Sequence, residues 1–290
     1  MSELRDFVYK DVRVDEGFDY LKKIPAEPDA RKKIDIFHAK PGSIPDAERL
    51  APAFVTYEKY PFFKTLEKQK CYGYNYFFVY GGVRITADLL TGPSRILKLA
   101  DKLAAKLADE APSPDPSRIE ELNESLDAFC KVVYTPGNCC PVMNNPHSSR
   151  NPEIRKDHDW EDTCYWKLKH CLDLDREYDG IQDAGWEVKL GDRDCENMFA
   201  VYPAKTTGSA IRDKLMLNDY YNGDELIVKP IPTQVRGEDL DDYAVRFIEY
   251  LKLYTSLIIR RGIRIFYCGN LPEDADITAL EVHVQKLAHP

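Results

Sequence analysis

The stretch from Glu238 to Arg261 constrains the fold most, because its apolar residues keep one helical period from end to end. They return every three or four positions, which places them on one face of a helix: Leu240, Tyr243, Ala244, Phe247, Leu251, Tyr254 and Ile258. Acidic residues occupy its first turns, and Arg260 and Arg261 stand in its last, as the helix dipole favours. Gly262 can then end the helix in the left-handed conformation. The sequence therefore predicts a long amphipathic helix whose apolar face other elements must cover.

Two more helices are predicted on either side of a proline-rich connector at residues 111–116. The segment that begins at Pro93 carries an apolar stripe at helical spacing. After the connector, Asp115 is a suitable N-cap residue and Pro116 can take the first helical position. Because the connector is short, we expect these helices to pack as an antiparallel hairpin.

Strand signals are fewer and shorter than the helical ones. Aromatic or β-branched runs near turn residues predict strands over 74–80, 198–202, 225–228 and 263–267. A further helix is expected over 157–175. The predicted fold is mainly α, a helical domain with a few short β-strands, and an α+β arrangement is the alternative. We expect one globular domain over residues 1–290, in which residues 1–60 form a loosely structured N-terminal extension.

The net charge of −9 bears on the partners of the chain. Affinity for a phosphate backbone comes mainly from lysine and arginine, so nucleic-acid binding is not expected. The densest basic cluster, Arg260, Arg261 and Arg264, is explained more simply by the dipole at a helix end. No apolar run reaches about 18 residues, and the start has no signal-peptide pattern. We therefore expect a cytoplasmic protein without a membrane span, whose eight cysteines are reduced.

The polar loop at residues 134–162 is the strongest candidate for a functional site. Asn138, Asn145 and Arg150 could surround an anionic or amide-bearing ligand, since asparagine amides both donate and accept and arginine offers a planar fork. The alternative is a structural connection whose polar side chains satisfy their own backbone.

A resemblance to a family rests on this loop and on a segment before it. The T-x-G-N-x-x-P element at residues 135–141, followed by Asn145 and Arg150, resembles the signature of an uncharacterised bacterial domain-of-unknown-function family. The upstream segments Thr86-Ala87-Asp88 and Gly92-Pro93-Ser94 are similar to a second element of that family. The resemblance implies a shared fold and a bacterial cytosolic setting, and it names no activity.

Two functional hypotheses follow from these residues. In the first, the chain binds a nucleotide-like or other anionic ligand through Thr86, Asp88, Arg95, Asn138, Asn145 and Arg150. In the second, it is a hydrolase or transferase in which Asp157 or His158 is the general base and Arg150 stabilises developing negative charge. No phosphate-loop motif and no zinc-type Cys or His spacing occurs, so we expect neither a cofactor nor a metal. The sequence leaves a homo-oligomer open.

Overall fold

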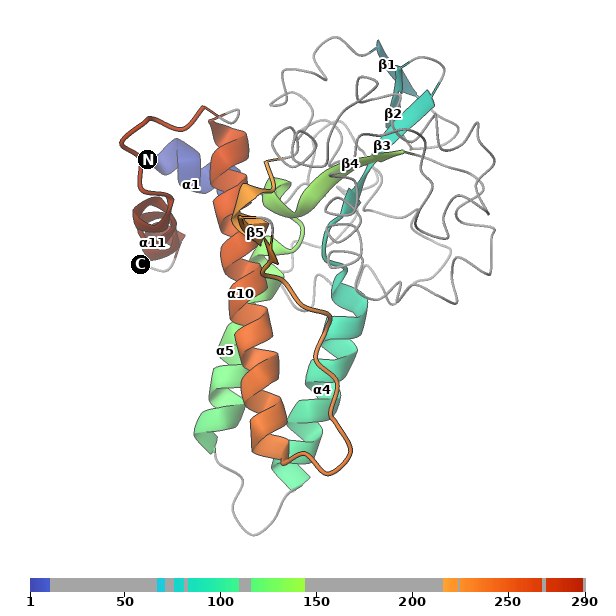
Figure 1. Cartoon of the computed structure of the whole chain (residues 1–290), viewed down its shortest axis with the longest axis vertical. Helices are drawn as coiled ribbons and strands as arrows, with labels where there is room; N and C mark the ends of the chain where they lie inside the picture. The colour runs from blue at the N-terminus through green and yellow to red at the C-terminus, as the bar shows by residue number, and fades with distance from the viewer. Residues whose placement is uncertain are drawn as a thin grey trace, which may run out of the picture.

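The computed structural model describes residues 1–10, 67–70, 76–80, 83–109, 116–143, 216–223, 225–267 and 270–288. Over these residues the fold is mainly α, as predicted, with a few short strands (Figure 1). The long helix α10 (Leu240–Phe266) is in contact with four other helices: α1 (Ser2–Val8), α4 (Pro93–Asp109), α5 (Pro116–Val132) and α11 (Ile277–Ala288). None of the helices described is both long and apolar enough to cross a membrane.

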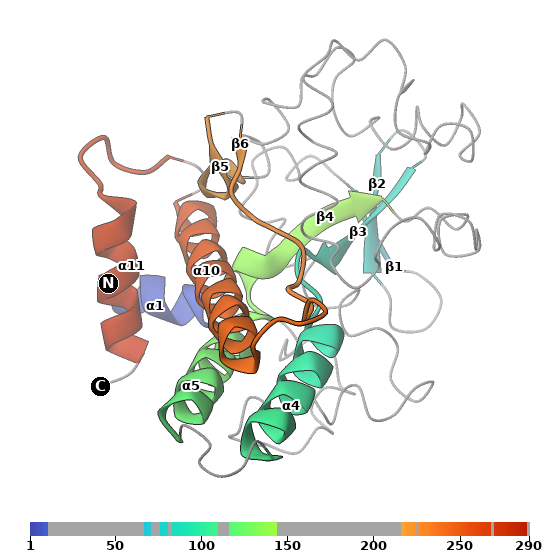
Figure 2. The same cartoon turned by 60° about the horizontal axis from the view of Figure 1, so that its bottom comes forward.

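The predicted hairpin is present as α4 (Pro93–Asp109) and α5 (Pro116–Val132). The two helices run antiparallel and both pack on α10 (Figure 2). Their buried apolar residues and those of α10 make one core, in which Ile96, Phe129 and Phe247 have no exposed surface. The apolar stripes found in the sequence therefore supply this core.

The start of α10 agrees with the sequence analysis, but its end does not. Asp239 is the N-cap, and its carboxylate accepts a hydrogen bond of 2.8 Å from the backbone N–H of Asp241. The helix continues past Gly262 to Phe266, so the strand predicted over 263–267 is wrong. Ile263 is fully buried in these last turns, and its burial in the helix outweighs the local strand preference.

Helices α1 (Ser2–Val8) and α11 (Ile277–Ala288) pack against each other and against α10. Leu4 and Val8 of α1 are each 1% exposed, so these first residues belong to the core. The rest of the predicted N-terminal extension, residues 11–60, lies outside the described residues. So do the helix predicted over 157–175 and the strand predicted over 198–202.

Four strands form an antiparallel sheet in the order β1 (Glu67–Lys70), β2 (Tyr76–Tyr80), β3 (Val83–Leu89) and β4 (Cys139–Met143). Of the strand predicted over 74–80, residues 76–80 are present as β2, and residues 74–75 lie outside the described residues. The strand predicted over 225–228 is only β6 (Glu225–Leu226), which pairs with β5 (Tyr221–Asn222) after the short 3-10 helix η6 (Asn218–Tyr220). A second 3-10 helix, η4 (Pro136–Asn138), joins α5 to β4.

Candidate functional site

The structure brings together two sequence-predicted elements that lie far apart in the chain: the turn from β3 to α4, and Asn138. The backbone N–H of Thr91 donates to the side-chain oxygen of Asn138 at 3.0 Å. The Asn138 amide nitrogen donates in return to the carbonyl of Thr91 at 2.9 Å and to that of Val133 at 2.7 Å. The Asn138 side chain thus extends the ladder of β3 and β4 by one residue and fixes the turn.

Asn138 therefore has a structural role in place of the predicted ligand contact. It has no exposed surface, and both hydrogens of its amide donate to the backbone carbonyls just described. Thr135, in the same motif, is also buried, and its hydroxyl donates to the carbonyl of Val132 at 2.7 Å. For Thr135 and Asn138, the structure therefore supports the structural alternative, in which polar side chains of the loop bond the backbone.

Gly137 completes the same motif by allowing η4 to touch the backbone of α10. A Cβ built on Gly137 would lie 2.0 Å from the carbonyl oxygen of Ile258. Gly262 lies on the α10 side of this contact, where a built Cβ would be 3.8 Å from the Cα of Gly137. Only glycine fits at position 137 without moving the two backbones apart.

The β3–α4 turn itself contains a polar group that no described residue satisfies. Thr91 is 2% exposed, and its hydroxyl oxygen has no hydrogen-bond partner in the part of the chain that the structure describes. Buried hydroxyls are nearly always paired, so an unpaired one points to a missing partner. The next residue, Gly92, faces open space, since no described atom lies within 4 Å of a Cβ built on it.

The first turn of α4 follows directly and has the chemistry of an anion site. The first backbone N–H groups of a helix have no intrahelical partner and carry the positive end of the dipole. Pro93 takes the first helical position and Arg95 follows within the same turn. Together with the Thr91 hydroxyl, these groups favour a negatively charged ligand.

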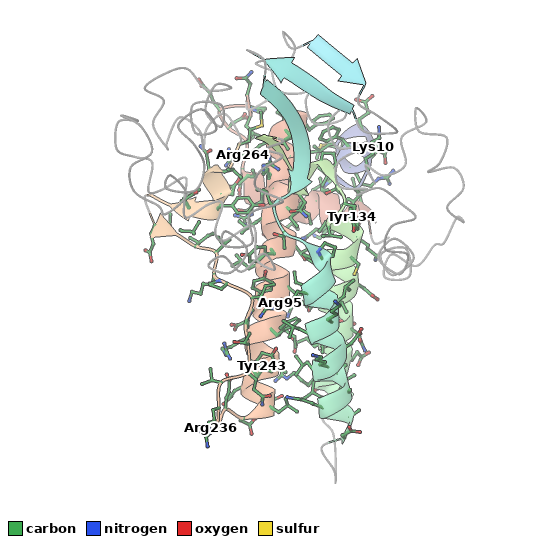
Figure 3. The ribbon with its side chains drawn as sticks, turned by 90° about the vertical axis from the view of Figure 1, so that its right-hand side faces the viewer. Lys10, Arg95, Tyr134, Arg236, Tyr243 and Arg264 are labelled. Carbon is green, nitrogen blue, oxygen red and sulfur yellow. The ribbon has the colours of Figure 1, made fainter. Side chains whose placement is uncertain are left out.

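Arg95 adds a positive charge where α4 and α10 run side by side (Figure 3). Burial raises the pKa of the Tyr243 phenol in α10, and the positive charges of Arg246 and Arg95 act in the opposite direction. Arg95 is partly buried and interacts with other residues of the chain. Its charge therefore contributes to the field at the start of α4 while its side chain is held in place.

The remaining sequence-predicted residues are spread along the strands or lie outside the description. In the β3–β4 ladder, Asp88 pairs with Cys140 near the α4 end, and Thr86 pairs with Val142 farther away. β4 thus carries the chain away from α4 before the predicted loop continues. Four candidate residues lie outside the described part of the chain: Asn145, Arg150, Asp157 and His158.

Sequence reasoning missed Thr91, although a local signal was present. The T-G-P-S segment at residues 91–94 places a hydroxyl residue directly before a Gly-Pro helix start. Hydroxyl side chains in such positions hydrogen-bond either the helix start or a ligand bound there. What the sequence could not give is the burial of the Thr91 hydroxyl with no partner among the residues that the structure describes.

The three arginines of the basic cluster at the end of α10 each bond another residue of the fold. Arg260 pairs with Glu281 of α11 at 2.6 Å. Arg261 has no exposed surface and donates to the carbonyl of Gly137 at 2.7 Å. Arg264 pairs with Asp219 of η6 through both Nε and Nη2. The three side chains point to three different elements and do not form a nucleic-acid surface.

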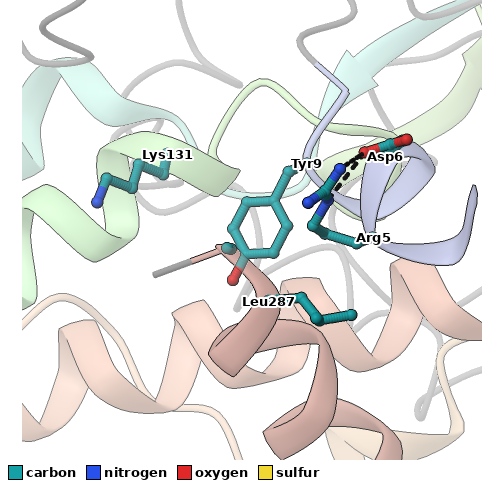
Figure 4. Close-up of a pocket in the computed structure, with 6 residues that line it drawn as sticks. Arg5, Asp6, Tyr9, Lys131 and Leu287 are labelled. Carbon is teal, nitrogen blue, oxygen red and sulfur yellow. Dashed lines mark hydrogen bonds and ion pairs between the residues drawn. The ribbon is translucent and has the colours of Figure 1, made fainter. Parts of the chain in front are cut away.

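An open pocket of about 450 Å³ lies between α1, the end of α5 and α11 (Figure 4). Tyr9 stands at its centre, and burial together with the negative charge of Glu281 raises the pKa of its phenol to about 12. Arg5 is engaged with Asp6 at 2.8 Å, and Lys131 extends away from the Tyr9 ring. The charged side chains that line this pocket do not converge on a common point. The pocket is therefore a weaker candidate for a ligand site than the β3–α4 turn.

In the described segments no group of three or more His, Cys, Asp or Glu side chains could hold a metal ion. Cys130, in α5, is a buried free thiol. No family model, no curated protein and no solved structure matches this chain.

Proposed function

We propose that this chain is a binding protein for a small anionic ligand, nucleotide-like or otherwise phosphate-bearing, held at the β3–α4 turn. The observation that carries the proposal is the Thr91 hydroxyl, which is buried and has no partner among the described residues. A phosphate oxygen is an acceptor that this hydroxyl and the first amides of α4 could share. The ligand would supply the hydrogen bond that the described residues leave unmade.

Two further observations support the same location. The open space beside Gly92 leaves room for a group close to the backbone. Asn138 holds the backbone of Thr91 at both its N–H and its carbonyl, so the turn is already fixed before a ligand arrives. A preorganised site loses less conformational freedom on binding.

The sequence-predicted residues divide into two groups in this proposal. Arg95 belongs to the binding site through its charge, and Asn138 positions the turn. Thr86, Asp88, Asn145 and Arg150 stay predicted ligand residues.

The test is calorimetric titration of the full chain with inorganic phosphate and with a panel of nucleoside mono-, di- and triphosphates. Saturable binding is expected for at least one of them. Thr91→Val removes the hydroxyl with little change of shape, so it should weaken that binding by about tenfold, one hydrogen bond to a charged group. The melting temperature should not fall, because the hydroxyl removed bonds no group in the described part of the chain.

Thr255→Val is the matched control. Thr255, in α10, is also buried, and its hydroxyl likewise has no described partner, but it is not in the β3–α4 turn. Its substitution should leave binding unchanged. The absence of saturable binding across the panel would overturn the proposal, as would equal losses of affinity in both variants.

A further inference from the structure

A line of basic residues runs along α4 away from the β3–α4 turn. It begins with Arg95 in the first turn of the helix and continues with Lys98 and Lys102, which are both exposed. At about 100° per residue, these three residues lie within a sector of about 60° of the helix surface. The positive charge at the start of α4 therefore extends down one side of the helix, and these three residues are called the basic line below.

The basic line lies on the side of α4 that approaches α10 and the segment before it. The positive charge of Arg95 acts on the Tyr243 phenol of α10. Lys106, farther along the same side of α4, donates to the side-chain oxygen of Gln234 at 2.7 Å. The line therefore begins at the proposed ligand site and ends where α4 is already bonded to the segment before α10.

The two lysines of the line are available to a ligand. In the described part of the chain, the side chains of Lys98 and Lys102 have no carboxylate partner, whereas Arg118 of α5 and Arg246 of α10 each have one. The acidic residue between the two lysines, Asp101, lies about 120° around the helix from Arg95. Asp101 also takes part in another interaction of the chain. The positive charge of the line is therefore not neutralised along its own side of α4.

The geometry of a helix brings these lysines towards the β3–α4 turn in steps. Lys98 follows Pro93 by five residues, a rise of about 7.5 Å. Helical side chains lean back towards the N-terminus, so the Lys98 ammonium can return to the level of the first turn. Lys102 lies about 6 Å farther along, and its ammonium can reach back to the level of Lys98. An anion that starts at the turn and extends along α4 would meet one cation after another.

We propose that the ligand of the β3–α4 turn carries a chain of two or more phosphates, as a nucleoside di- or triphosphate or an inorganic condensed phosphate does. This inference rests on the proposed function, which places one phosphate at the Thr91 hydroxyl and the first amides of α4. The second phosphate then meets Lys98 beside the charge of Arg95. The third phosphate, about one helical turn from the first, meets Lys102.

The far end of α4 limits the length of the ligand. Lys106 follows Pro93 by thirteen residues, about 20 Å, and it is already bonded to Gln234. Asp109 ends the helix with a negative charge. The net charge of −9 also repels a long polyanion at a distance. These features favour a short chain of phosphates over a nucleic-acid backbone.

The test is calorimetric titration of the full chain with two series of anions, without divalent cations. The inorganic series is phosphate, pyrophosphate and tripolyphosphate, and the nucleoside series is adenosine mono-, di- and triphosphate. At low salt each added phosphate should tighten binding by about fivefold, the contribution of one exposed ion pair. The gain should shrink at about 0.5 M salt, because exposed charges are screened. A gain confined to one series would identify the source of the phosphates.

Three single variants locate the gain along α4. Lys98→Gln should weaken the binding of pyrophosphate and of adenosine diphosphate by about fivefold and that of phosphate by less than about twofold. Lys102→Gln should weaken only the anions with three phosphates. Lys106→Gln is the matched control, because it removes the same charge from the same helix beyond the reach of three phosphates. It should leave every affinity unchanged, and all three variants should keep their melting temperature, as expected for exposed positions.

The outcomes separate this inference from the function on which it rests. Binding that Thr91→Val weakens, but that does not tighten with the number of phosphates, would overturn the inference and leave the anion site in place. Equal losses from Lys98→Gln and Lys106→Gln would overturn it too, since they indicate a general attraction to positive charge. So would a single-stranded oligonucleotide that binds more tightly than tripolyphosphate and loses affinity in Lys98→Gln. The absence of binding to every anion would overturn both proposals.

Discussion

The two ends of α10 are both rich in charge, yet they are held in different ways. At the start, Arg118 of α5 pairs with Asp241 at 2.7 Å, and the Asp241 side chain is 52% exposed. At the other end, Arg261 is fully buried and bonds the carbonyl of Gly137, and Arg264 pairs with Asp219, whose side chain is 8% exposed. The acidic partner is half exposed in the first set, whereas Asp219 and Arg261 are shielded from solvent in the second.

This difference shows that burial, more than the number of charges, decides what a charged helix end contributes. An exposed ion pair is worth little, because water and salt solvate each partner almost as well as the pair does. A buried arginine without its acceptor would instead remain desolvated and uncompensated. The last turns of α10 should therefore respond to single substitutions much more strongly than the first turns.

The largest effect is expected for Gly137→Ala. Its new Cβ would lie 2.0 Å from the Ile258 carbonyl oxygen, so η4 and α10 must separate. We expect the free energy of unfolding to fall by about 3 kcal/mol or more, measured by urea denaturation. Gly262→Ala is the control on the other side of the same contact, where a Cβ meets Val8 at 3.5 Å. It should change stability by less than about 1 kcal/mol; equal losses in both variants would contradict the close approach.

A second comparison uses the same substitution at the two ends of α10. Arg261→Met removes the buried donor and leaves the Gly137 carbonyl unpaired, so it should cost about 2 kcal/mol. Arg118→Met removes two exposed pairs, with Asp241 and with Glu121, and should cost at most about 1 kcal/mol. Urea denaturation of both variants under one set of conditions gives the two values. If Arg118→Met were the more costly, the distinction between the two ends would be wrong.

A third prediction concerns the partly buried pair of Arg264 and Asp219. Asp219→Asn should lower the free energy of unfolding by about 1 kcal/mol. The loss should change little between low and high salt, because the carboxylate is shielded from solvent. A double-mutant cycle with Arg264→Gln isolates the interaction energy. A coupling that disappears in high salt would place this pair with the exposed ones.

The smallest expected effect is an acid dependence from two carboxylates, Glu121 in α5 and Glu238 just before α10. The hydrogen bond from Lys252 lowers the pKa of Glu121, and that from the backbone of Val235 lowers the pKa of Glu238. A carboxyl whose pKa is lower in the folded state stabilises the fold above its unfolded pKa, and this contribution is lost as the pH falls through the folded value. Both ordinary values are 4.5, so the loss should occur below that pH.

The measurement is the free energy of unfolding between about pH 3 and about pH 6. The double variant Glu121→Gln and Glu238→Gln should lose less stability on acidification than the unmodified chain. Parallel curves for the two proteins would show that these carboxylates do not contribute.

The sequence predicts the helices well where local chemistry and apolar period agree. Asp239 as N-cap, Pro116 as the first residue of α5 and the apolar face of α10 are all set by neighbours within one or two turns. The predicted end of α10 is wrong because Gly262 lies inside the helix, although glycine commonly ends helices. It lies beside Val8 and Gly137, contacts between distant segments that no local pattern contains.

The candidate site was predicted in part and for a partly wrong reason. The T-x-G-N motif and the upstream segment do meet, through Asn138 and Thr91, 47 residues apart. Local sequence shows that an asparagine can bind a ligand, but it does not show that backbone carbonyls, one of them in a distant turn, will take both of its amide hydrogens. The burial of the Thr91 hydroxyl, which has no partner among the described residues, depends on the same distant packing, so only the three-dimensional structure reveals it.

The contact of α1 with α10 and α11 has a consequence for synthesis on the ribosome. Val8 ends α1, whereas α10 begins at Leu240, and at about 5 to 20 residues per second this interval takes roughly 10 to 50 seconds. A seven-residue helix is not stable alone in water. Leu4 and Val8 therefore leave the ribosome long before the surfaces that bury them, and during that time they are open to chaperones.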